Sequence, residues 1–381
     1  MRRACLLALA ALLVAGCSTI DKINPFSSSD KGPKPAELPA VQGGADLQAR
    51  WQAGVGGAKD FIFSPAVVGE SVYAAAQDGT VARIEQGRVA WRVSVGKPIS
   101  GGVGSDGKHV AVGTAKGEVI VLDAADGREA WQARVSSEVL AAPSVGAGLV
   151  VVRSGDSRIF GFEAGDGKRR WVYTRSVPAL SLRSTVGVVV DGRVTLAGFP
   201  GGKLVAIANN NGAAVWEVTV ALPRGATELE RVADVTSNPV IDGNMVCAAA
   251  FQGKVSCFDA GSGNPLWSRD LSSARGVDID ARHVYATDDK GAVHALDRKT
   301  GASVWKQDKL FLRGVSRPLS RGAVVAVADY QGYVHLLRGA DGAFAARAAT
   351  DGSAIRSDPV ALDKGLVVQT ANGDMFAFDA R

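Results

Sequence analysis

The sequence predicts an all-β protein built as an eight-bladed β-propeller, and three observations lead to this prediction. A unit of about 40 residues recurs along the chain, and nearly every copy ends on an aromatic residue. Each copy alternates short β-patterned runs with tight turns, as in residues 117–131, GEVIVLDAADGREAW. No long stretch with a helical period follows the N-terminus, and 46 glycines are available for turns. Four short strands in a unit of this length are typical of a propeller blade.

The N-terminus has the pattern of a bacterial lipoprotein signal, predicted to span residues 1–16. A basic start, Arg2-Arg3, precedes an apolar run that is too short to cross a membrane as a helix. The run ends in Leu13-Val14-Ala15-Gly16-Cys17, which resembles a lipobox, so Cys17 is predicted to carry the lipid. The residue after the predicted lipidated cysteine is Ser18. An aspartate at this position would favour retention in the inner membrane, so the predicted location is the periplasmic face of the outer membrane.

Residues 17–40 are predicted to be a lipidated flexible tether, because they are rich in Ser, Pro and Lys and cannot bury a core. A flexible chain of this length spans roughly 25 Å. Without Arg2 and Arg3 the chain has 41 basic residues against 38 acidic ones, and no dense basic run follows. Nucleic acid is therefore not expected as a partner.

Residues 41–381 are predicted to form the propeller. The repeats end on aromatic residues spaced by 40, 40, 40, 45, 51, 38 and 39 positions, namely Trp51, Trp91, Trp131, Trp171, Trp216, Trp267, Trp305 and Phe344. Trp51 has no hairpin before it, whereas the last repeat stops at Arg381 without an outer strand. We expect residues 48–53 to supply that strand and to close the ring. The Trp side chains are expected to pack between neighbouring blades rather than to form a ligand cage.

No residue pattern predicts catalysis, a metal site or a cofactor. His294 and His335 occupy equivalent positions in consecutive repeats where other repeats have mainly apolar residues, which indicates a packing position. No nucleophile elbow, P-loop or dinucleotide fingerprint appears in the required context. Cys247 and Cys257 flank a turn in the fifth repeat, and the spacing leaves open whether they form a disulfide or remain buried thiols.

The repeat form, the lipobox and the tether together resemble the BamB family, lipoproteins of the outer-membrane β-barrel assembly (BAM) machinery built on a quinoprotein-dehydrogenase-like or WD40-like propeller. Two segments carry the more specific resemblance, residues 180–183 and 231–234. The resemblance implies contacts with the periplasmic POTRA domains of BamA, the barrel subunit, through Leu180, Leu182, Arg183, Arg231 and Asp234. The chain departs from the family at Thr236, where a second acidic residue is usual.

The implied function is that of a non-catalytic scaffold that assists the assembly and insertion of barrel proteins. The rival class is a quinoprotein dehydrogenase with pyrroloquinoline quinone and Ca²⁺, but the paired cysteines, stacking Trp and Ca²⁺ ligands of such enzymes are not recognisable. A propeller that binds peptides of nascent outer-membrane proteins is a further alternative. The two largest repeat spacings, 45 and 51 residues, place the longest connections before the fourth and fifth blades, where the two segments lie. By contrast, Arg313 lies in the connection before the seventh blade, and changing it to Glu is expected to leave binding to BamA unchanged.

Overall fold

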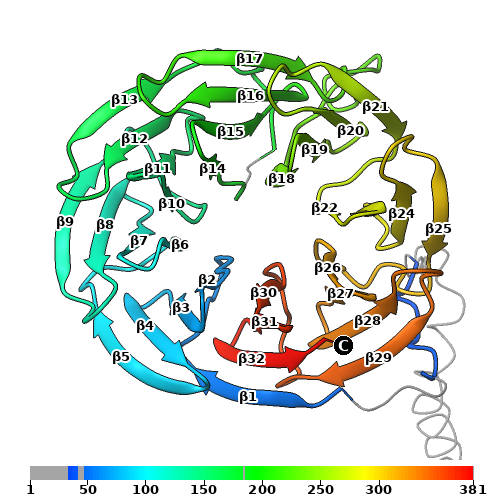
Figure 1. Cartoon of the computed structure of the whole chain (residues 1–381), viewed down its shortest axis with the longest axis horizontal. Helices are drawn as coiled ribbons and strands as arrows, with labels where there is room; N and C mark the ends of the chain where they lie inside the picture. The colour runs from blue at the N-terminus through cyan, green and yellow to red at the C-terminus, as the bar shows by residue number, and fades with distance from the viewer. Residues whose placement is uncertain (1–32, 42–46, 183–184, 381) are drawn as a thin grey trace, which may run out of the picture. The chain divides into compact units, whose positions relative to one another are not determined.

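The computed structural model describes residues 33–41, 47–182 and 185–380, so the predicted signal and Cys17 lie outside the described residues. The chain divides after Pro35 into two units, and of the first unit only residues 33–35 are described, without regular secondary structure. The second unit, Ala36–Arg381, is a ring of eight four-stranded antiparallel sheets (Figure 1). This arrangement confirms the predicted eight-bladed propeller. In the described part of the chain no helix is long and apolar enough to cross a membrane.

The strands run from the centre of the ring outward within each blade. Those of the first four blades are β2 (Ala66–Val68), β3 (Ser71–Ala75), β4 (Thr80–Glu85), β5 (Arg88–Ser94), β6 (Gly101–Ser105), β7 (His109–Gly113), β8 (Glu118–Asp123), β9 (Glu129–Arg134), β10 (Ser144–Gly146), β11 (Leu149–Arg153), β12 (Ile159–Glu163), β13 (Arg169–Tyr173), β14 (Val189–Asp191), β15 (Val194–Phe199), β16 (Lys203–Ala208) and β17 (Ala214–Thr219). Those of the last four are β18 (Val240–Asp242), β19 (Met245–Ala249), β20 (Lys254–Asp259), β21 (Pro265–Asp270), β22 (Gly276–Ile279), β23 (His283–Thr287), β24 (Val293–Asp297), β25 (Ser303–Gln307), β26 (Leu319–Arg321), β27 (Val324–Ala328), β28 (Tyr333–Arg338), β29 (Phe344–Ala349), β30 (Val360–Leu362), β31 (Gly365–Gln369), β32 (Asp374–Asp379) and β1 (Ala49–Gly54).

The two middle strands of each blade form the core, because both of their faces are covered by the neighbouring blades. In the second blade every residue from Val110 to Gly113 is buried, and so is the run Val119–Leu122 on the paired strand. Gly117 turns the chain between them with a φ of 77°, a conformation that glycine adopts without strain. The outer strands alternate buried and exposed residues, since only one of their faces packs against the ring.

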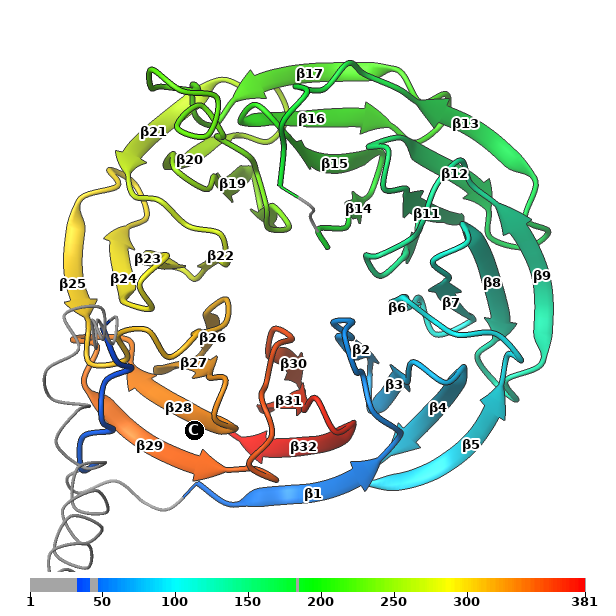
Figure 2. The ribbon, with the colours of Figure 1, turned by 180° about the vertical axis from the view of Figure 1, so that it is seen from behind.

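The ring closes as the sequence predicts. β1 pairs antiparallel with β32, so that Trp51 lies opposite Ala377 and Gly54 opposite Asp374 (Figure 2). The eighth sheet therefore has the order β1-β32-β31-β30 and combines the two ends of the chain. Closure leaves both chain ends paired within one sheet, which removes two open strand edges.

The Trp side chains join each blade to the next through a hydrogen bond as well as by packing. Trp131 Nε1 donates to the carbonyl of Ala164 at 2.7 Å, and Trp171 Nε1 donates to that of Asn209 at 2.8 Å. The acceptor is always the residue that follows the third strand of the next blade. The other donor–acceptor pairs are Trp91–Ala124, Trp216–Ala260, Trp267–Arg298 and Trp305–Gly339. Interblade packing of the Trp side chains is thus confirmed.

Trp51 departs from this pattern. Its Nε1 is buried and finds no hydrogen-bond partner among the described residues. In the first blade only Gln86 and Gly87 separate the third strand from the fourth, whereas residues 124–128 fill the same connection in the second blade. The shorter turn packs Gly87 against the Trp51 ring but leaves no carbonyl where the indole N–H could reach it.

The end of the predicted tether lies against the propeller. The N–H of Ala36 donates to the carbonyl of Phe311 at 2.9 Å, and Nη1 of Arg313 donates to the carbonyl of Ala36 at 3.1 Å. Leu38 packs against the apolar cluster that contains Trp305 and Leu310. The packed chain therefore begins at Ala36, a few residues before the predicted boundary at residue 40.

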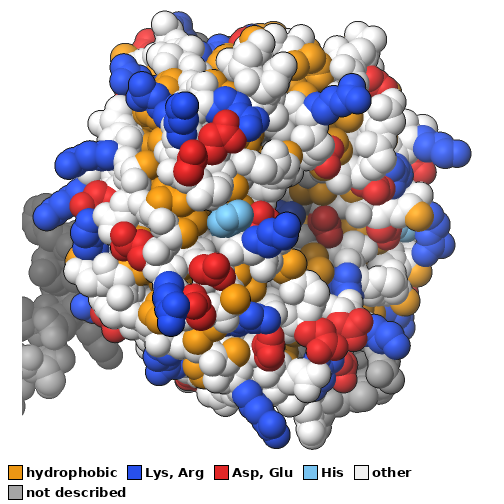
Figure 3. Space-filling view, turned by 60° about the vertical axis from the view of Figure 1, so that its left-hand side comes forward, with side chains coloured by type: hydrophobic (Ala, Val, Ile, Leu, Met, Phe, Trp, Pro, Cys, Tyr) orange, Lys and Arg blue, Asp and Glu red, His pale blue; other side chains and the backbone are white. Residues whose placement is uncertain are grey.

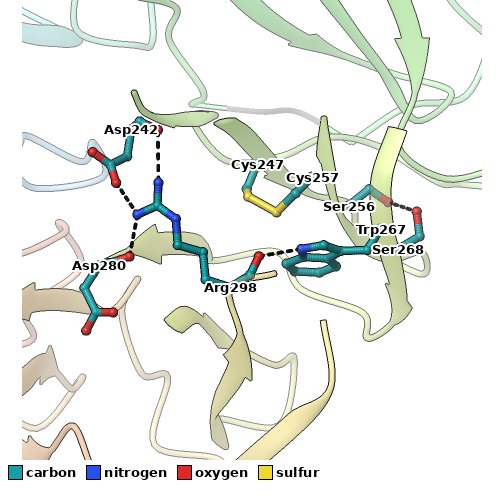
Figure 4. Close-up of a disulfide and its surroundings, with 8 residues drawn as sticks. All are labelled: Asp242, Cys247, Ser256, Cys257, Trp267, Ser268, Asp280 and Arg298. Carbon is teal, nitrogen blue, oxygen red and sulfur yellow. Dashed lines mark hydrogen bonds and ion pairs between the residues drawn. A yellow bond between two sulfur atoms is a disulfide. The ribbon is translucent and has the colours of Figure 1, made fainter. Parts of the chain in front are cut away.

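Cys247 and Cys257 form a disulfide between β19 and β20 (Figure 4). The two residues are paired directly opposite one another, with a Cα–Cα distance of 4.1 Å, and both are fully buried. Trp267 of the neighbouring outer strand packs in the same apolar cluster. The structure thereby selects the disulfide from the two alternatives that the sequence left open.

Candidate partner-binding surface

Two long connections that lead into the fourth and fifth blades carry the predicted partner-binding residues. Residues 174–188 join β13 to β14, and residues 220–239 join β17 to β18 (Figure 2). Both are far longer than a hairpin turn. Loops of this length on a regular scaffold are common sites of recognition.

A buried carboxylate ties the two connections together. Asp234, which is 3% exposed, accepts a hydrogen bond from the N–H of Leu182 on Oδ2 at 2.7 Å. Its Oδ1 accepts a second one from the N–H of Gly201 at 3.0 Å, in the turn between β15 and β16. The carbonyl of Asp234 accepts a third from the N–H of Phe251 at 2.8 Å. Three separate loops therefore converge on this one residue.

The leucines that the resemblance implicates are exposed. Leu180 and Leu182 are 42% and 39% exposed, although both are apolar. The backbone of Leu182 is held by Asp234, so its side chain projects from a fixed position. Arg183 lies outside the described residues.

The second connection adds two exposed leucines that sequence reasoning did not single out. Leu222 is 62% exposed and Leu229 is 71% exposed. The only signal available in the sequence is their place in a polar segment, ALPRGATELERV, where apolar residues have no turn function. We call Leu180, Leu182, Leu222 and Leu229 the leucine surface.

The segment that carries Leu229 is held by its own hydrogen bonds. Glu230 accepts from the N–H groups of Ala226 and Thr227 at 2.7 and 3.1 Å, and Thr227 Oγ1 accepts from the N–H of Glu230 at 3.2 Å. These backbone donors lower the pKa of Glu230. This reciprocal arrangement is the one found where a Ser or Thr and a Glu three residues later begin a helical turn.

Arg231 belongs to the same segment and makes its contacts within it. Its Nε donates to the carbonyl of Gly225 at 3.0 Å, and its Nη1 lies 3.5 Å from a carboxylate oxygen of Glu228. The side chain remains half exposed. Gln252, with its amide nitrogen turned toward the loop, donates to the carbonyls of Leu229, Glu230 and Val232 at 3.0–3.2 Å. The structure thus places Arg231 on the connection of Asp234, but without a contact to residues 180–182 among the interactions of the described chain.

Thr236 is the position at which the resemblance implies a second acidic residue. It is partly buried, and its Oγ1 lies 3.5 Å from the carbonyl of Ala274. It lines the cavities on either side of the connection. A neutral hydroxyl therefore occupies this position, in the wall of a cavity that Leu182 also lines.

The four histidines have hydrogen-bond partners that the sequence spacing did not indicate. His294 and His335 lie 2.9 and 3.0 Å from carboxylate oxygens of Asp288 and Asp329, six residues earlier in their blades. His109 lies 3.3 Å from Asp106, and His283 lies 3.1 Å from the hydroxyl of Tyr285. Among the described residues, no group of three or more His, Cys, Asp or Glu side chains could hold a metal ion.

Charged side chains of both signs are interspersed over the side of the ring drawn in Figure 3, with small apolar areas between them. This mixture reflects a chain with 43 basic and 38 acidic residues. Specific recognition therefore has to come from local features such as the leucine surface. A rigid propeller that displays exposed apolar side chains on its longest connections is a protein-binding scaffold.

Comparison with known proteins places this scaffold in a family. Residues 77–307 match the family model described as outer membrane protein assembly factor BamB. The chain is 44% identical to the outer membrane protein assembly factor BamB of Bordetella pertussis over 96% of its own length and 95% of that relative. It superposes on the crystal structure of BamB from Moraxella catarrhalis with a TM-score of 0.81 at 28% identity, covering 88% of this chain and all of that one. The chain belongs to the BamB family of outer membrane protein assembly factors.

The likeness to enzymes concerns the fold alone. Quinohemoprotein alcohol dehydrogenase from Comamonas testosteroni superposes with a TM-score of 0.70, covering 90% of this chain and 79% of the enzyme, but at only 15% identity. Propellers host many unrelated functions, so a shared fold does not carry the activity with it.

Proposed function

We propose that the protein is a non-catalytic scaffold of the outer-membrane barrel assembly machinery and binds the periplasmic POTRA domains of BamA through the leucine surface. Its relatives are named as assembly factors rather than as enzymes. The observation that carries the proposal is the exposed Leu182, held in place by the buried Asp234 on the two longest connections. Burying an exposed leucine against a partner contributes about 1–2 kcal/mol, and a fixed loop loses little entropy on binding.

Cys17 is the proposed site of lipid attachment. A lipobox cysteine after a short apolar run supports anchoring at the periplasmic face of the outer membrane, with the tether predicted from the sequence between the lipid and the propeller. Changing Cys17 to Ala is expected to leave the propeller folded and to release it from membranes. Membrane fractionation checks this, and a variant that still pellets with the outer membrane would contradict the lipid anchor.

Capture of BamA from detergent-solubilised membranes tests the partner. Leu182→Ala is expected to weaken capture about tenfold, while the melting temperature stays unchanged because the side chain is exposed. Leu266→Ala is the matched control, since Leu266 is a leucine of similar exposure, 48%, on the outer strand β21. Normal capture by the Leu182 variant, or an equal loss with the Leu266 variant, would refute the proposed surface.

A further inference from the structure

A cavity of about 250 Å³ lies between the third and fourth blades, directly beside the leucine surface. Leu182 and Ser181 form part of its wall, so the cavity adjoins the connection that we propose binds the partner. The polar residues that line it include Glu138, Arg153, Ser154, Ser157, Ser181 and Asp234. A partner that covers Leu182 would therefore also cover this cavity.

Arg153 brings a positive charge to the cavity from the end of β11. Its guanidinium stacks over the ring of Phe199, with 4.8 Å between the guanidinium carbon and the ring centroid. It donates to the carbonyls of Gly198 and Val186, both of which belong to the fourth blade or its entry. Its Nε is buried and has no hydrogen-bond partner among the described residues. The side chain thus bridges two blades, but only neutral carbonyls receive its hydrogen bonds.

No carboxylate compensates this charge among the residues that the structure describes. Asp234 is hydrogen bonded to Leu182 and Gly201, and Asp156, near the cavity, is bonded to Ser136 and Ser154. Glu138 also lines the cavity and has an interaction of its own, but no ion pair joins it to Arg153 within the described chain. Burial lowers the pKa of Arg153 to about 10, with no acidic neighbour acting in the opposite direction, and the group still carries its charge at neutral pH. An uncompensated charge that is largely removed from water is costly to the free protein and favours an anionic partner.

Two hydroxyl groups add donors to the same wall. Ser157 and Ser181 line the cavity, and neither side chain takes part in a hydrogen bond within the described chain. A guanidinium with two nearby hydroxyls is suited to a carboxylate, which accepts several hydrogen bonds at once. A cavity of about 250 Å³ has room for a carboxylate side chain together with water molecules.

We propose that this cavity receives an Asp or Glu side chain of the partner protein that docks on the leucine surface, with Arg153 as the counter-charge. The inference rests on the proposed function, because the acidic side chain comes from the same partner. The leucines supply apolar contact, and the buried guanidinium selects the partner that presents an acid at the right place. Arg153 would then be a specificity-determining residue inside the ring rather than on its surface.

A pair of variants at Ser181 tests the proposal without removing Arg153. Ser181 is exposed and belongs to a loop, so the propeller tolerates a longer side chain there. Ser181→Glu places a carboxylate of the protein itself at the cavity, where it competes with the partner's acid. Ser181→Gln adds nearly the same volume without charge. With full-length proteins in detergent, we expect the Glu variant to bind BamA about tenfold more weakly and the Gln variant to bind within about twofold of the unmodified protein.

Arg153→Gln supplies the complementary measurement, with Arg134→Gln on the second blade as the control. The Arg153 variant is expected to bind BamA about tenfold more weakly, whereas the control variant is expected to bind BamA with unchanged affinity. Equal losses for both Ser181 variants, or normal binding by Ser181→Glu, would overturn the proposal. If the cavity proposal fails in this way but Leu182→Ala still weakens binding to BamA, the leucine surface remains supported as the docking site. Normal binding by the Leu182 variant as well would instead remove the proposed function itself.

Discussion

Asp234 holds the backbone of Leu182 through a 2.7 Å hydrogen bond that links residues 52 positions apart in the sequence. The family resemblance implicates both residues in partner contact, yet they have different surroundings. Leu182 is exposed, whereas Asp234 is buried and has both carboxylate oxygens occupied within the protein. In the proposed partner surface, Asp234 therefore fixes Leu182 and does not present a free acid.

This relationship predicts that Asp234→Ala destabilises the propeller by about 2–3 kcal/mol, because two partly buried N–H groups lose a charged acceptor that is itself buried. The same change is expected to weaken capture of BamA, since residues 180–182 are no longer held. Urea unfolding measures the first effect. Asp270→Ala is the control, because this acid is 85% exposed on an outer strand and its loss should cost little. Equal unfolding free energies for the two variants would contradict the buried role of Asp234.

Arg313 has surroundings that sequence reasoning did not foresee. It lies in the connection before the seventh blade, and its change to Glu was expected to leave capture of BamA unchanged. The residue is 2% exposed, its Nε donates to Asp329 at 2.7 Å, and it also binds the carbonyl of Ala36. The docked end of the tether and a buried acid enclose it, and neither could be foreseen from the spacing of the repeats.

Arg313→Glu is therefore expected to cost about 3–5 kcal/mol or more, because it places a second negative charge beside the buried Asp329. Thermal unfolding measures this cost directly. Arg269→Glu, on the exposed outer strand β21, makes the same charge change and should shift the melting temperature by little. Similar melting temperatures for the two variants would contradict the buried ion pair.

His335 and Asp329 predict how stability depends on pH. Burial lowers the pKa of His335 below its ordinary value of 6.5, with Arg347 and Arg313 acting in the same direction and Asp329 only partly opposing them. The folded protein therefore binds fewer protons at this site than the unfolded chain once the pH falls below about 6.5. Burial alone would raise the pKa of Asp329, but hydrogen bonds from His335, Tyr333 and Arg313 outweigh it and lower the pKa. The stabilisation due to Asp329 is complete above about pH 3.8 and is lost at lower pH, as its folded-state pKa is passed.

The unfolding free energy is thus expected to decline from pH 6.5 toward pH 5, by at most about 1.4 kcal/mol for each pH unit. Replacing His335 with Phe, the residue at the equivalent position in the third and eighth blades (Phe160 and Phe376), should flatten this part of the profile. Urea unfolding at a series of pH values measures the slope. An unchanged slope in the Phe variant would show that other groups set the pH dependence.

The repeat could be predicted from the sequence because the same local structural signals recur in each blade. Turn glycines, β-patterned runs and an aromatic residue recur at fixed places, and these predict the number of blades. The two incomplete repeats complement one another, and this predicts the strand that closes the ring. The position of the longest connections also followed from the spacing alone.

The details of the site could not be predicted in the same way, because they depend on contacts between loops far apart in the sequence. The burial of Asp234 requires Gly201 and Phe251 to meet it from other turns. The exposure of Leu222 and Leu229 depends on a loop that closes on itself through Glu230. Nothing in the repeat pattern shows that Arg153 ends beside a cavity and has no ion-pair partner among the described residues.

The eighth blade is joined to its neighbours without the indole hydrogen bond found elsewhere in the described ring. Phe344 stands at the boundary between the seventh and eighth blades and has no N–H to donate. Trp51 stands at the boundary with the first blade, and its N–H has no acceptor. The blade that contains both chain ends is thus bounded by the two interfaces that lack a bond worth about 1 kcal/mol.

We therefore expect the ring to open first at the eighth blade. Amide hydrogen exchange should be faster in β30, β31 and β32 than in the matching strands of the third blade, whose interfaces have Trp131 and Trp171 fully bonded. Deleting residues through Gly54 should expose the edge of β32 and cost several kcal/mol, whereas deleting only through Pro35 should leave stability unchanged. Equal exchange in the third and eighth blades would show that the eighth blade is not the weak point of the ring. Equal melting temperatures for the two truncations would show that closure through β1 does not stabilise the ring.

The turn of the first blade offers a direct test of the missing bond. Lengthening Gln86-Gly87 to the five-residue form of the second blade would supply a hydrogen-bond acceptor for Trp51 and should slow amide exchange in β32.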